Sequence, residues 1–471
     1  MPRRSVLGVV ELEGILVQPL ATILCLTVVS IATGQTKKVN YRDHVRPLFV
    51  KHCTRCHNST NAKGDLDLSS YSTALAGGSS GEVLIAQDAV QSRLYRLINH
   101  LAQPHMPRGR RKLPAKQIKL VQSWIVGGLL EDPGSKPRVS LRKSVLKFAA
   151  PARRRPKSLP KLSWPTRQAV RYRRPNPITA LAAHPWKPWC VVGGNKQVLL
   201  FEVPSLKLLR ALPFPDVGPT SLRFSRDGRH LIGVGGRGGE SGLIVVWDTY
   251  SGTVQHSFDE EEDTILDGDY LQATRTAMFG SAKRFIGTLQ HGKSQPTNKL
   301  NGHTDWISAL AIDPSGKWLA SGDRAGGALL WDLKRSAKLF DLRGHQGPIT
   351  AINWRRDGRV LATSSDDGSA RLWVASSGKL ARGIIAHEKG ALDIEFTHNG
   401  RFVTGGRDRQ VKLWDQFGDP LKTFPKMPES VTCVAVSNDG KSIIAGDFAG
   451  NVYCWSMNGK VVGRTTSHPS R

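Results

Sequence analysis

Short apolar segments that alternate with polar positions recur throughout residues 176–471. The segment 307–312 (ISALAI) is typical, because its alternation is that of a half-buried, pleated strand. Between such segments stand turn-forming pairs such as Asp227-Gly228 and Asp439-Gly440, which favour tight β-hairpins. The pattern predicts that this part of the chain is all-β.

The strands recur with a period of about 42 residues. The period is marked by His303, His345 and His387, spaced by 42 residues, and by Trp331, Trp373, Trp414 and Trp455, spaced by 42, 41 and 41. A Gly-His pair early in the period and a Trp-Asp pair late in it resemble the WD-repeat family, whose repeat forms one four-stranded blade of a β-propeller. The pairs that carry the resemblance are Gly302-His303, Gly344-His345, Trp247-Asp248, Trp331-Asp332 and Trp414-Asp415.

The spacing of the tryptophans gives the number of blades. Phe201 holds the Trp position of the first repeat and Trp247 marks the second, but the next marker, Trp331, comes two periods later. Leu289 stands where the missing marker should be, in a stretch without alternation. We therefore expect seven blades over 176–471, with a degenerate third blade at about 259–300. The third repeat keeps its length but lacks the strand pattern, as it would after a compensated frameshift. This origin is a hypothesis.

Ring closure can also be predicted from the pattern. One more candidate strand, 461–466, follows the last tryptophan marker and could pair with the blade at the other end of the repeat array. We expect this segment to complete the first blade as its outer strand. Closure of this kind uses only the strands of the propeller, so residues 176–471 are expected to fold without the rest of the chain.

A group of polar residues recurs in the repeats and could be mistaken for a catalytic site. His345, Thr363 and Asp367 combine an imidazole, a hydroxyl and a carboxylate, next to Trp373, and the same set returns one period later. Taken alone, the set suggests a hydrolase triad. Its repetition favours a buried hydrogen-bond network that braces each blade. The fourth repeat has Ala325 in the acid position, so we expect its network to be incomplete.

Residues 38–132 show helical instead of strand periodicity. Apolar positions predict one helix ending at His52, a second capped by Ser92, and a third that begins at Pro114 and stops near Gly127. Their inward faces are Tyr41, Val45, Leu48 and Phe49 in the first helix, Leu94, Leu97, Ile98 and Leu101 in the second, and Ile118, Val121, Trp124, Ile125 and Leu129 in the third. The N-terminal domain is thus predicted to be small and all-α.

The strongest chemical signal in this domain is Cys53-Thr54-Arg55-Cys56-His57. This is the pattern by which haem is attached covalently in c-type cytochromes. Two thiols three positions apart lie on one helical turn and can form thioethers with the two vinyl groups of one haem, and the histidine then reaches the iron as proximal ligand. A zinc site would need a second close Cys/His pair and a thioredoxin-like motif a βαβ setting, and the sequence shows neither.

A second signal, Met106-Pro107, lies in the loop between the second and third predicted helices. Together with the cysteine motif and the segment 118–128, it resembles the small cytochrome c domain of planctomycete proteins. The resemblance implies one covalently attached haem c, held by the two motif cysteines, with the motif histidine as proximal ligand and Met106 as distal ligand. His100 and His105 are alternative distal ligands. A thioether would give a higher potential than a second imidazole.

The N-terminal segment indicates export. Arg3 and Arg4 are followed by an apolar run at 20–31, and Ala32 and Gly34 supply small residues for a signal peptidase. We expect a cleaved signal peptide at 1–34 and a periplasmic or cell-envelope location. If uncleaved, this segment would be just long enough to act as a membrane anchor.

The charge of the chain is concentrated around a linker. The formal net charge is +29, and residues 136–174 contain no Asp or Glu. Arginines and prolines alternate along 133–175, so we expect an extended, solvated linker. It could bind an acidic envelope polymer, lipid headgroups or an acidic redox partner, or serve as a spacer lying across another part of the protein. Export disfavours nucleic acid as a partner.

These features predict a multidomain protein, in which a small all-α cytochrome c-like domain precedes an all-β seven-bladed WD-repeat propeller. We expect it to transfer electrons through its haem and to dock a redox partner or envelope protein on the propeller. The alternative is an envelope interaction scaffold in which the haem is a redox sensor or incidental. No residue pattern supports an enzyme, and propellers host both binding and catalysis, so the fold does not decide.

Overall fold

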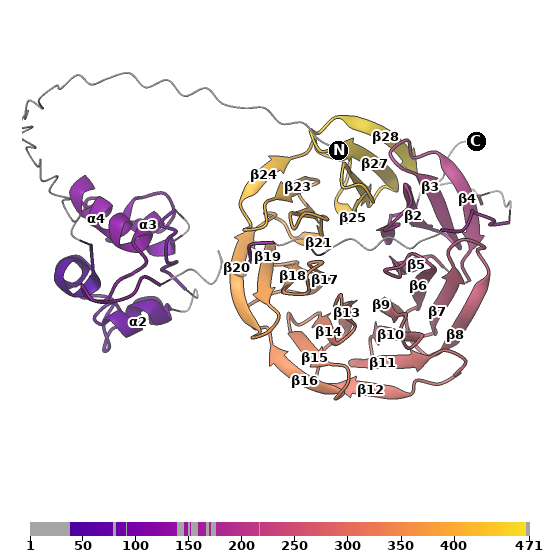
Figure 1. Cartoon of the computed structure of the whole chain (residues 1–471), viewed down its shortest axis with the longest axis horizontal. Coiled ribbons are helices and arrows are strands. Elements are labelled where there is room, and N and C mark those ends of the chain that lie inside the picture. The colour runs from indigo at the N-terminus through magenta and orange to yellow at the C-terminus, as the bar shows by residue number, and fades with distance from the viewer. Residues whose placement is uncertain are drawn as a thin grey trace, which may run out of the picture. The chain divides into compact units, whose positions relative to one another are not determined.

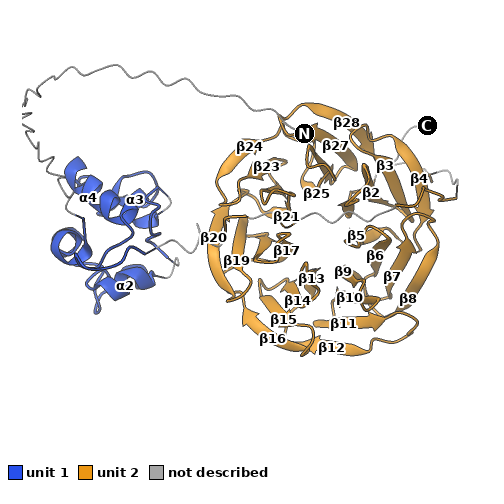
Figure 2. Cartoon of the chain, in the orientation of Figure 1, with its two compact units in different colours: residues 1–138 blue, residues 139–471 orange. Residues whose placement is uncertain are grey.

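The computed structural model describes residues 38–78, 82–90, 92–138, 146–148, 151, 159–165, 169–170, 176–215 and 217–467. The chain divides into two compact units, residues 1–138 and 139–471, here called unit 1 and unit 2 (Figure 2). The expected signal peptide lies outside the described residues. No helix in the described part of the chain is long and apolar enough to span a membrane.

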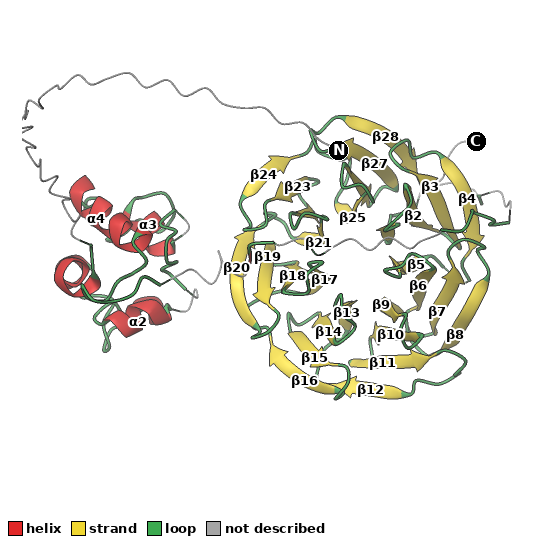
Figure 3. Cartoon of the chain, in the orientation of Figure 1, coloured by secondary structure: helices red, strands yellow, loops and turns green. Residues whose placement is uncertain are grey.

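Unit 1 is helical (Figure 3). Its elements are the π-helix η1 (Tyr41–Val45), α1 (Arg46–His52), the 3₁₀-helix η2 (Lys63–Asp65), α2 (Tyr71–Ala76), α3 (Arg93–Ile98) and α4 (Ala115–Val126). The three expected helices form, while η2 and α2 were not expected. The first helical segment begins after Asn40, whose side-chain oxygen accepts a hydrogen bond from the Asp43 N–H at 2.8 Å.

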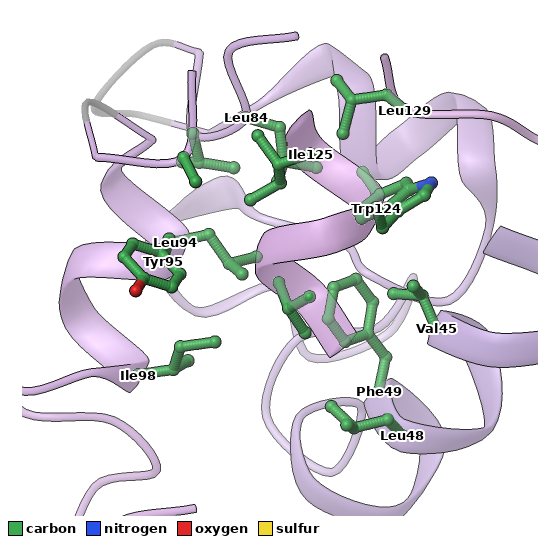
Figure 4. Close-up of a cluster of buried hydrophobic side chains, with 14 of the residues drawn as sticks. Val45, Leu48, Phe49, Leu84, Leu94, Tyr95, Ile98, Trp124, Ile125 and Leu129 are labelled. Carbon is green, nitrogen blue, oxygen red and sulfur yellow. The ribbon is translucent and has the colours of Figure 1, made fainter. Parts of the chain in front are cut away.

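The core of unit 1 is mainly aliphatic and contains a few aromatic rings (Figure 4). Phe49 of α1 and Trp124 of α4 are fully buried, with ring centroids 6.1 Å apart. The Trp124 indole N–H donates to the Leu130 carbonyl at 2.9 Å, so its polar atom is satisfied. One expected core residue is wrong: Leu101 is 57% exposed, because α3 ends at Ile98 and the chain turns away before Leu101.

Unit 2 contains seven antiparallel sheets of four strands each among its described residues, arranged as the blades of a propeller (Figure 1). Blade 1 consists of β1 (Leu181–Ala183), β2 (Trp189–Gly194), β3 (Gln197–Glu202) and β4 (Leu208–Pro213), and blade 2 of β5 (Pro219–Phe224), β6 (His230–Arg237), β7 (Ser241–Asp248) and β8 (Val254–Glu261). Blade 3 consists of β9 (Ile265–Leu271), β10 (Thr276–Ser281), β11 (Phe285–Gln290) and β12 (Asn298–Asn301), and blade 4 of β13 (Ile307–Ile312), β14 (Trp318–Asp323), β15 (Ala328–Asp332) and β16 (Ala337–Asp341). Blade 5 consists of β17 (Ile349–Trp354), β18 (Val360–Ser365), β19 (Ser369–Val374) and β20 (Lys379–Ile385). Blade 6 consists of β21 (Ala391–Phe396), β22 (Phe402–Gly406), β23 (Val411–Trp414) and β24 (Pro420–Thr423), and blade 7 of β25 (Val431–Val436), β26 (Ser442–Asp447), β27 (Asn451–Ser456) and β28 (Val461–Thr466).

The expectation of a degenerate third blade is wrong. Strands β9 to β12 pair in antiparallel register with one shift, at Gly280/Ser281, and Leu289 is fully buried in the place of the missing tryptophan. Phe279 of β10 pairs with Gly287 of β11, and a Cβ on Gly287 would lie 2.2 Å from the Phe279 ring. In blade 3, the Phe279 ring lies over Gly287 and fills the space beside this glycine. The complete sheet removes the reason for suspecting a frameshift.

The expected closure of the ring is also wrong. Strand β28 pairs with β27 inside blade 7, and blade 1 has its own outer strand, β4. The seam between these blades is closed instead at Ile178, just before β1. Its N–H donates to the Asp447 carbonyl at 3.1 Å, and its carbonyl accepts from the Thr432 hydroxyl at 2.6 Å. Asn176 adds a further link, because its N–H donates to the Ser467 hydroxyl at 3.1 Å.

The linker expected over 133–175 is not solvated throughout. Its described segments 146–148, 159–165 and 169–170, here called the strap, pack against unit 2, which agrees with the alternative of a spacer lying across another part of the protein. Leu146 is fully buried in a core cluster of unit 2, and its carbonyl accepts a hydrogen bond from Arg355 at 2.7 Å. Trp164 is only 3% exposed, and its indole N–H donates to the Thr249 carbonyl at 2.6 Å. The strap therefore belongs to unit 2. The arginine clusters at 153–155 and 171–174 lie outside the described residues.

Candidate functional site

The repeated polar sets of unit 2 are hydrogen-bond networks inside single blades. In blade 5, the His345 ring contacts the Thr363 hydroxyl at 2.7 Å and the Asp367 carboxylate at 3.1 Å. The Trp373 indole N–H donates to the same hydroxyl at 2.9 Å. The imidazole is buried with all its partners inside the blade, which agrees with the expected bracing role.

The network of blade 4 is complete, contrary to expectation. Asp323, two residues before Ala325, supplies the carboxylate: its Oδ2 lies 2.8 Å from His303 Nδ1. The hydroxyl comes from Ser321, 2.6 Å from His303 Nε2. The other carboxylate oxygen of Asp323 accepts from the Gly327 N–H at 2.7 Å, so one side chain both completes the network and holds the turn.

The inner strands of the seven blades enclose a polar cavity of about 560 Å³. Arg223 of β5 forms an ion pair with Asp267 of β9 at 3.0 Å inside it. Asp393 and Glu395 of β21 also line the cavity. Burial raises the pKa of Asp393 to about 6, and burial followed by the nearby Asp393 charge raises the pKa of Glu395 to about 8. This charged lining could not be recognised in the sequence, because its members are scattered over the repeats.

The cysteine motif lies in a tight turn at the end of α1. Cys53 caps the helix, with its N–H donating to the Phe49 carbonyl at 2.7 Å. The N–H groups of Cys56 and His57 then both donate to the Cys53 carbonyl at 3.1 Å. The turn keeps the two half-buried, free cysteines near each other. Burial raises the pKa of the Cys53 thiol to about 12, so this thiol is neutral and lies in an apolar environment.

One ring nitrogen of the motif histidine is left without a partner in the described part of the chain. Nδ1 of His57 is buried and has no hydrogen-bond partner among the described residues. Its main chain, by contrast, is fixed, because the His57 carbonyl accepts from the Leu68 N–H at 3.0 Å. A buried imidazole nitrogen without a partner is uncommon in a finished core and is available to a ligand. His52 was not among the candidate ligands. Its Nε2 is also buried and has no hydrogen-bond partner among the described residues.

Met106 lies on the same hydrophobic cluster as Cys53. Both side chains are partly buried and pack against the core that contains Phe49 and Trp124. The fold thus brings the loop after α3 to the core that also receives the end of α1, although the two residues are 53 positions apart in sequence.

Comparison with known families matches residues 53–108 to the family described as planctomycete cytochrome C. It also matches residues 294–332, 336–374, 378–415 and 418–456 to the WD domain, G-beta repeat. The chain joins a planctomycete cytochrome C domain to a WD40 propeller. The first match includes the cysteine motif and Met106, and the second covers four of the seven blades.

Similar curated proteins match only part of the chain. Autophagy-related protein 16 of Arabidopsis thaliana is 36% identical over 94 residues, or 19% of this chain and 18% of that protein. Small ribosomal subunit protein RACK1y of Oryza sativa subsp. japonica is 23% identical over 192 residues, or 39% and 44%. Target of rapamycin complex subunit wat1 of Schizosaccharomyces pombe is 30% identical over 226 residues, or 45% and 56%. The chain thus spans from under a fifth to just over half of the length of these relatives.

The residues of the cytochrome C domain fit a haem c site. The two motif cysteines are close and free, the His57 ring has an unpartnered buried nitrogen, and Met106 borders the same apolar cluster. The alternative ligands His100 and His105 are more constrained: their rings stack with centroids 4.4 Å apart and an interplanar angle of 2°. Nε2 of His100 contacts the Met106 carbonyl at 3.2 Å. These contacts favour Met106 over either histidine.

Proposed function

We propose that this protein is an exported c-type cytochrome that transfers electrons through one covalently attached haem and docks its partner on the WD40 propeller. The observation that carries the proposal is that Cys53 of the motif and Met106 both pack against the one apolar core of unit 1, while Nδ1 of His57 is buried without a partner in the described structure. A signal peptide at 1–34, as expected from the sequence, would put haem attachment outside the cytoplasm.

Each site residue has a distinct role in this proposal. Cys53 and Cys56 would hold the haem through thioethers, and His57 and Met106 would be its axial ligands. When bound, the haem supplies one-electron redox chemistry. Burial of the Cys53 side chain keeps water away from the attachment point, and the fixed main chain of His57 orients the imidazole. Two protein ligands would favour electron transfer over the binding of small molecules.

The charge near the site favours an acidic partner. Arg108, Arg110, Arg111 and Lys112 follow Met106 closely and are exposed. No ion pair joins them to any acidic residue in the described part of the chain. Four unpaired cations at one loop attract an acidic protein surface. The arginines of the linker could add contacts to an acidic envelope polymer or to lipid headgroups.

A second function, that of an envelope interaction scaffold, is favoured by the propeller itself. A WD40 propeller suggests a protein-interaction platform. Of the similar proteins, one is named a small ribosomal subunit protein and another a target of rapamycin complex subunit. In this reading partner binding is the main activity, and the haem would report the redox state of the envelope. A partner retained equally by the oxidised and reduced protein would favour the scaffold.

Covalent attachment can be tested on the full chain, expressed in a host that attaches haem. Changing Cys53 and Cys56 together to Ala should abolish peroxidase staining of the band after denaturing electrophoresis, because thioethers survive unfolding and coordination does not. Cys433→Ala is a matched control, since this buried cysteine lies in the propeller and its removal should leave the staining intact. A stained band from the double variant would overturn the proposal. Reversible redox titration of the stained wild type then tests electron transfer.

A further inference from the structure

The loop that carries Met106 is held on both sides of this residue by the end of α3. The Met106 N–H donates to the Leu97 carbonyl at 3.1 Å, and the Met106 carbonyl contacts Nε2 of His100 at 3.2 Å. From these contacts we propose that His100 is a positioning residue, which holds the Met106 main chain so that its thioether is presented to the haem iron. The inference rests on the proposed function, because it assumes that Met106 is the distal ligand.

The chemistry of the contact fixes the state of the His100 ring. A carbonyl oxygen only accepts, so Nε2 of His100 must carry the proton and donate it. His100 is therefore a hydrogen-bond donor to the loop, and its Nε2 has no lone pair left for iron. His100, an alternative distal ligand in the sequence analysis, thus instead holds the loop that carries Met106.

Two further features hold the His100 ring in place. The ring stacks on His105, with centroids 4.4 Å apart and an interplanar angle of 2°. The backbone of His100 has a φ of +58°, a conformation that side-chain-bearing residues rarely adopt, and it turns the chain directly after α3. The His100 N–H donates to the same Leu97 carbonyl that receives the Met106 N–H. Helix end, stacked ring and methionine thus form one connected unit.

The connection explains how a short loop could present its methionine in one position. Met106 is partly buried against the core of unit 1, but residues 103–105 before it are exposed. Without the His100 hydrogen bond, the Met106 main chain would keep one hydrogen bond within the described residues, the bond to the Leu97 carbonyl. The loss of one such bond should shift the equilibrium between bound and released thioether by roughly 2- to 12-fold.

The experiment compares four substitutions in the haem-loaded full chain. His100→Phe keeps a ring that can stack on His105 but removes the donor, and His100→Gln keeps a donor at a similar distance but removes the ring. His105→Ala removes the stacking partner, and Met106→Ala removes the thioether. The measurements are the thioether–iron charge-transfer band of the ferric protein, the rate of carbon monoxide binding to the ferrous protein, and the redox potential.

The proposal predicts an order of effects. His100→Phe should weaken the charge-transfer band, lower the potential and speed carbon monoxide binding by roughly 2- to 12-fold. His100→Gln should restore most of the band, and Met106→Ala should abolish it. If Met106→Ala opens the iron while His100→Phe behaves as the wild type, the positioning role is refuted and Met106 remains the ligand. If the wild type shows no such band and Met106→Ala changes nothing, the ligand assignment in the proposed function fails, and with it this inference.

Discussion

Two carboxyl groups of the propeller, those of Asp367 and Glu395, have pKa values shifted in opposite directions. Burial alone would raise the pKa of Asp367, but hydrogen bonds from His345 and Ser369 outweigh it and hold the pKa below its ordinary range. Glu395 lies in the central cavity, where burial and the charge of Asp393 raise its pKa from 4.5 to about 8. Asp367 therefore stabilises the fold as an anion, whereas Glu395 stabilises it as a neutral acid.

Replacing Glu395 by Gln should flatten the dependence of stability on pH. Because the folded pKa of Glu395 is raised, its contribution is fully present below pH 4.5 and is lost as pH rises through about 8. Wild-type stability should thus fall across this window with an added slope of up to about 1.4 kcal/mol per pH unit. Gln cannot ionise, so the free energy of unfolding of the variant should increase relative to that of the wild type as pH rises. Urea unfolding of both proteins between pH 5 and 9 measures the difference.

Asp367→Asn serves as a control with the opposite sign. A depressed pKa gives stability that is present above the ordinary value of 3.8 and is lost as pH falls through the folded pKa. The variant should therefore be less stable than the wild type at neutral pH and approach it in acid. Parallel pH curves for the wild type and Glu395→Gln would show that Glu395 is ionised in the folded protein.

Among the elements, the strap is predicted to stabilise the propeller by docking on it. Trp164→Ala should destabilise residues 139–471 by about 3–5 kcal/mol, because it empties a buried site and leaves the Thr249 carbonyl without its donor. Trp164→Phe should cost less, since it keeps most of the ring volume. Urea unfolding of the two variants and their parent measures both changes. A loss below about 0.5 kcal/mol for the alanine variant, as at ordinary surface sites, would mean that the strap is not docked in solution.

Elements with strong periodicity could be predicted from the sequence, and elements that depend on tertiary partners could not. Three helices of unit 1 follow from apolar spacing, and the seven-blade repeat follows from the spacing of its tryptophans and its resemblance to WD repeats. Blade 3 was misjudged because its packing uses an aromatic ring over Gly287, which leaves no alternation to detect. The strap was misjudged because its basic, proline-rich composition hides Leu146 and Trp164, whose sites exist only in the folded propeller.

The candidate site shows the same division. The cysteine motif is local and could be recognised directly, and Met106 could be recognised through the resemblance. The role inferred for His100 depends on a ring stack and on a contact across six residues, and neither leaves a pattern in the sequence. In the sequence, His100 was an alternative distal ligand. Its contacts in the structure indicate that it supports the proposed ligand, Met106.

At the scale of the whole molecule, the propeller closes without a sheet shared between its ends. Each blade contains four strands in chain order, so closure depends on contacts between blade 7 and the residues just before β1. The seam contains a buried cluster to which Ile178, Phe201, Cys433 and Ile444 contribute. Such a seam is held by packing and a few hydrogen bonds, and it is the natural place for the ring to open.

Removing β28 tests this closure. A chain that ends at Ser456 loses the outer strand of blade 7 and the Ser467–Asn176 hydrogen bond at the seam. Strand β27 becomes an exposed edge, and each lost strand hydrogen bond should cost about 0.5–1.5 kcal/mol, so several kcal/mol should be lost in total. Thermal unfolding of residues 139–456, against a control that lacks only 468–471, measures the loss. Equal melting temperatures would show that β28 adds nothing to closure, whereas a separate early transition would show that the ring opens at this seam before it unfolds.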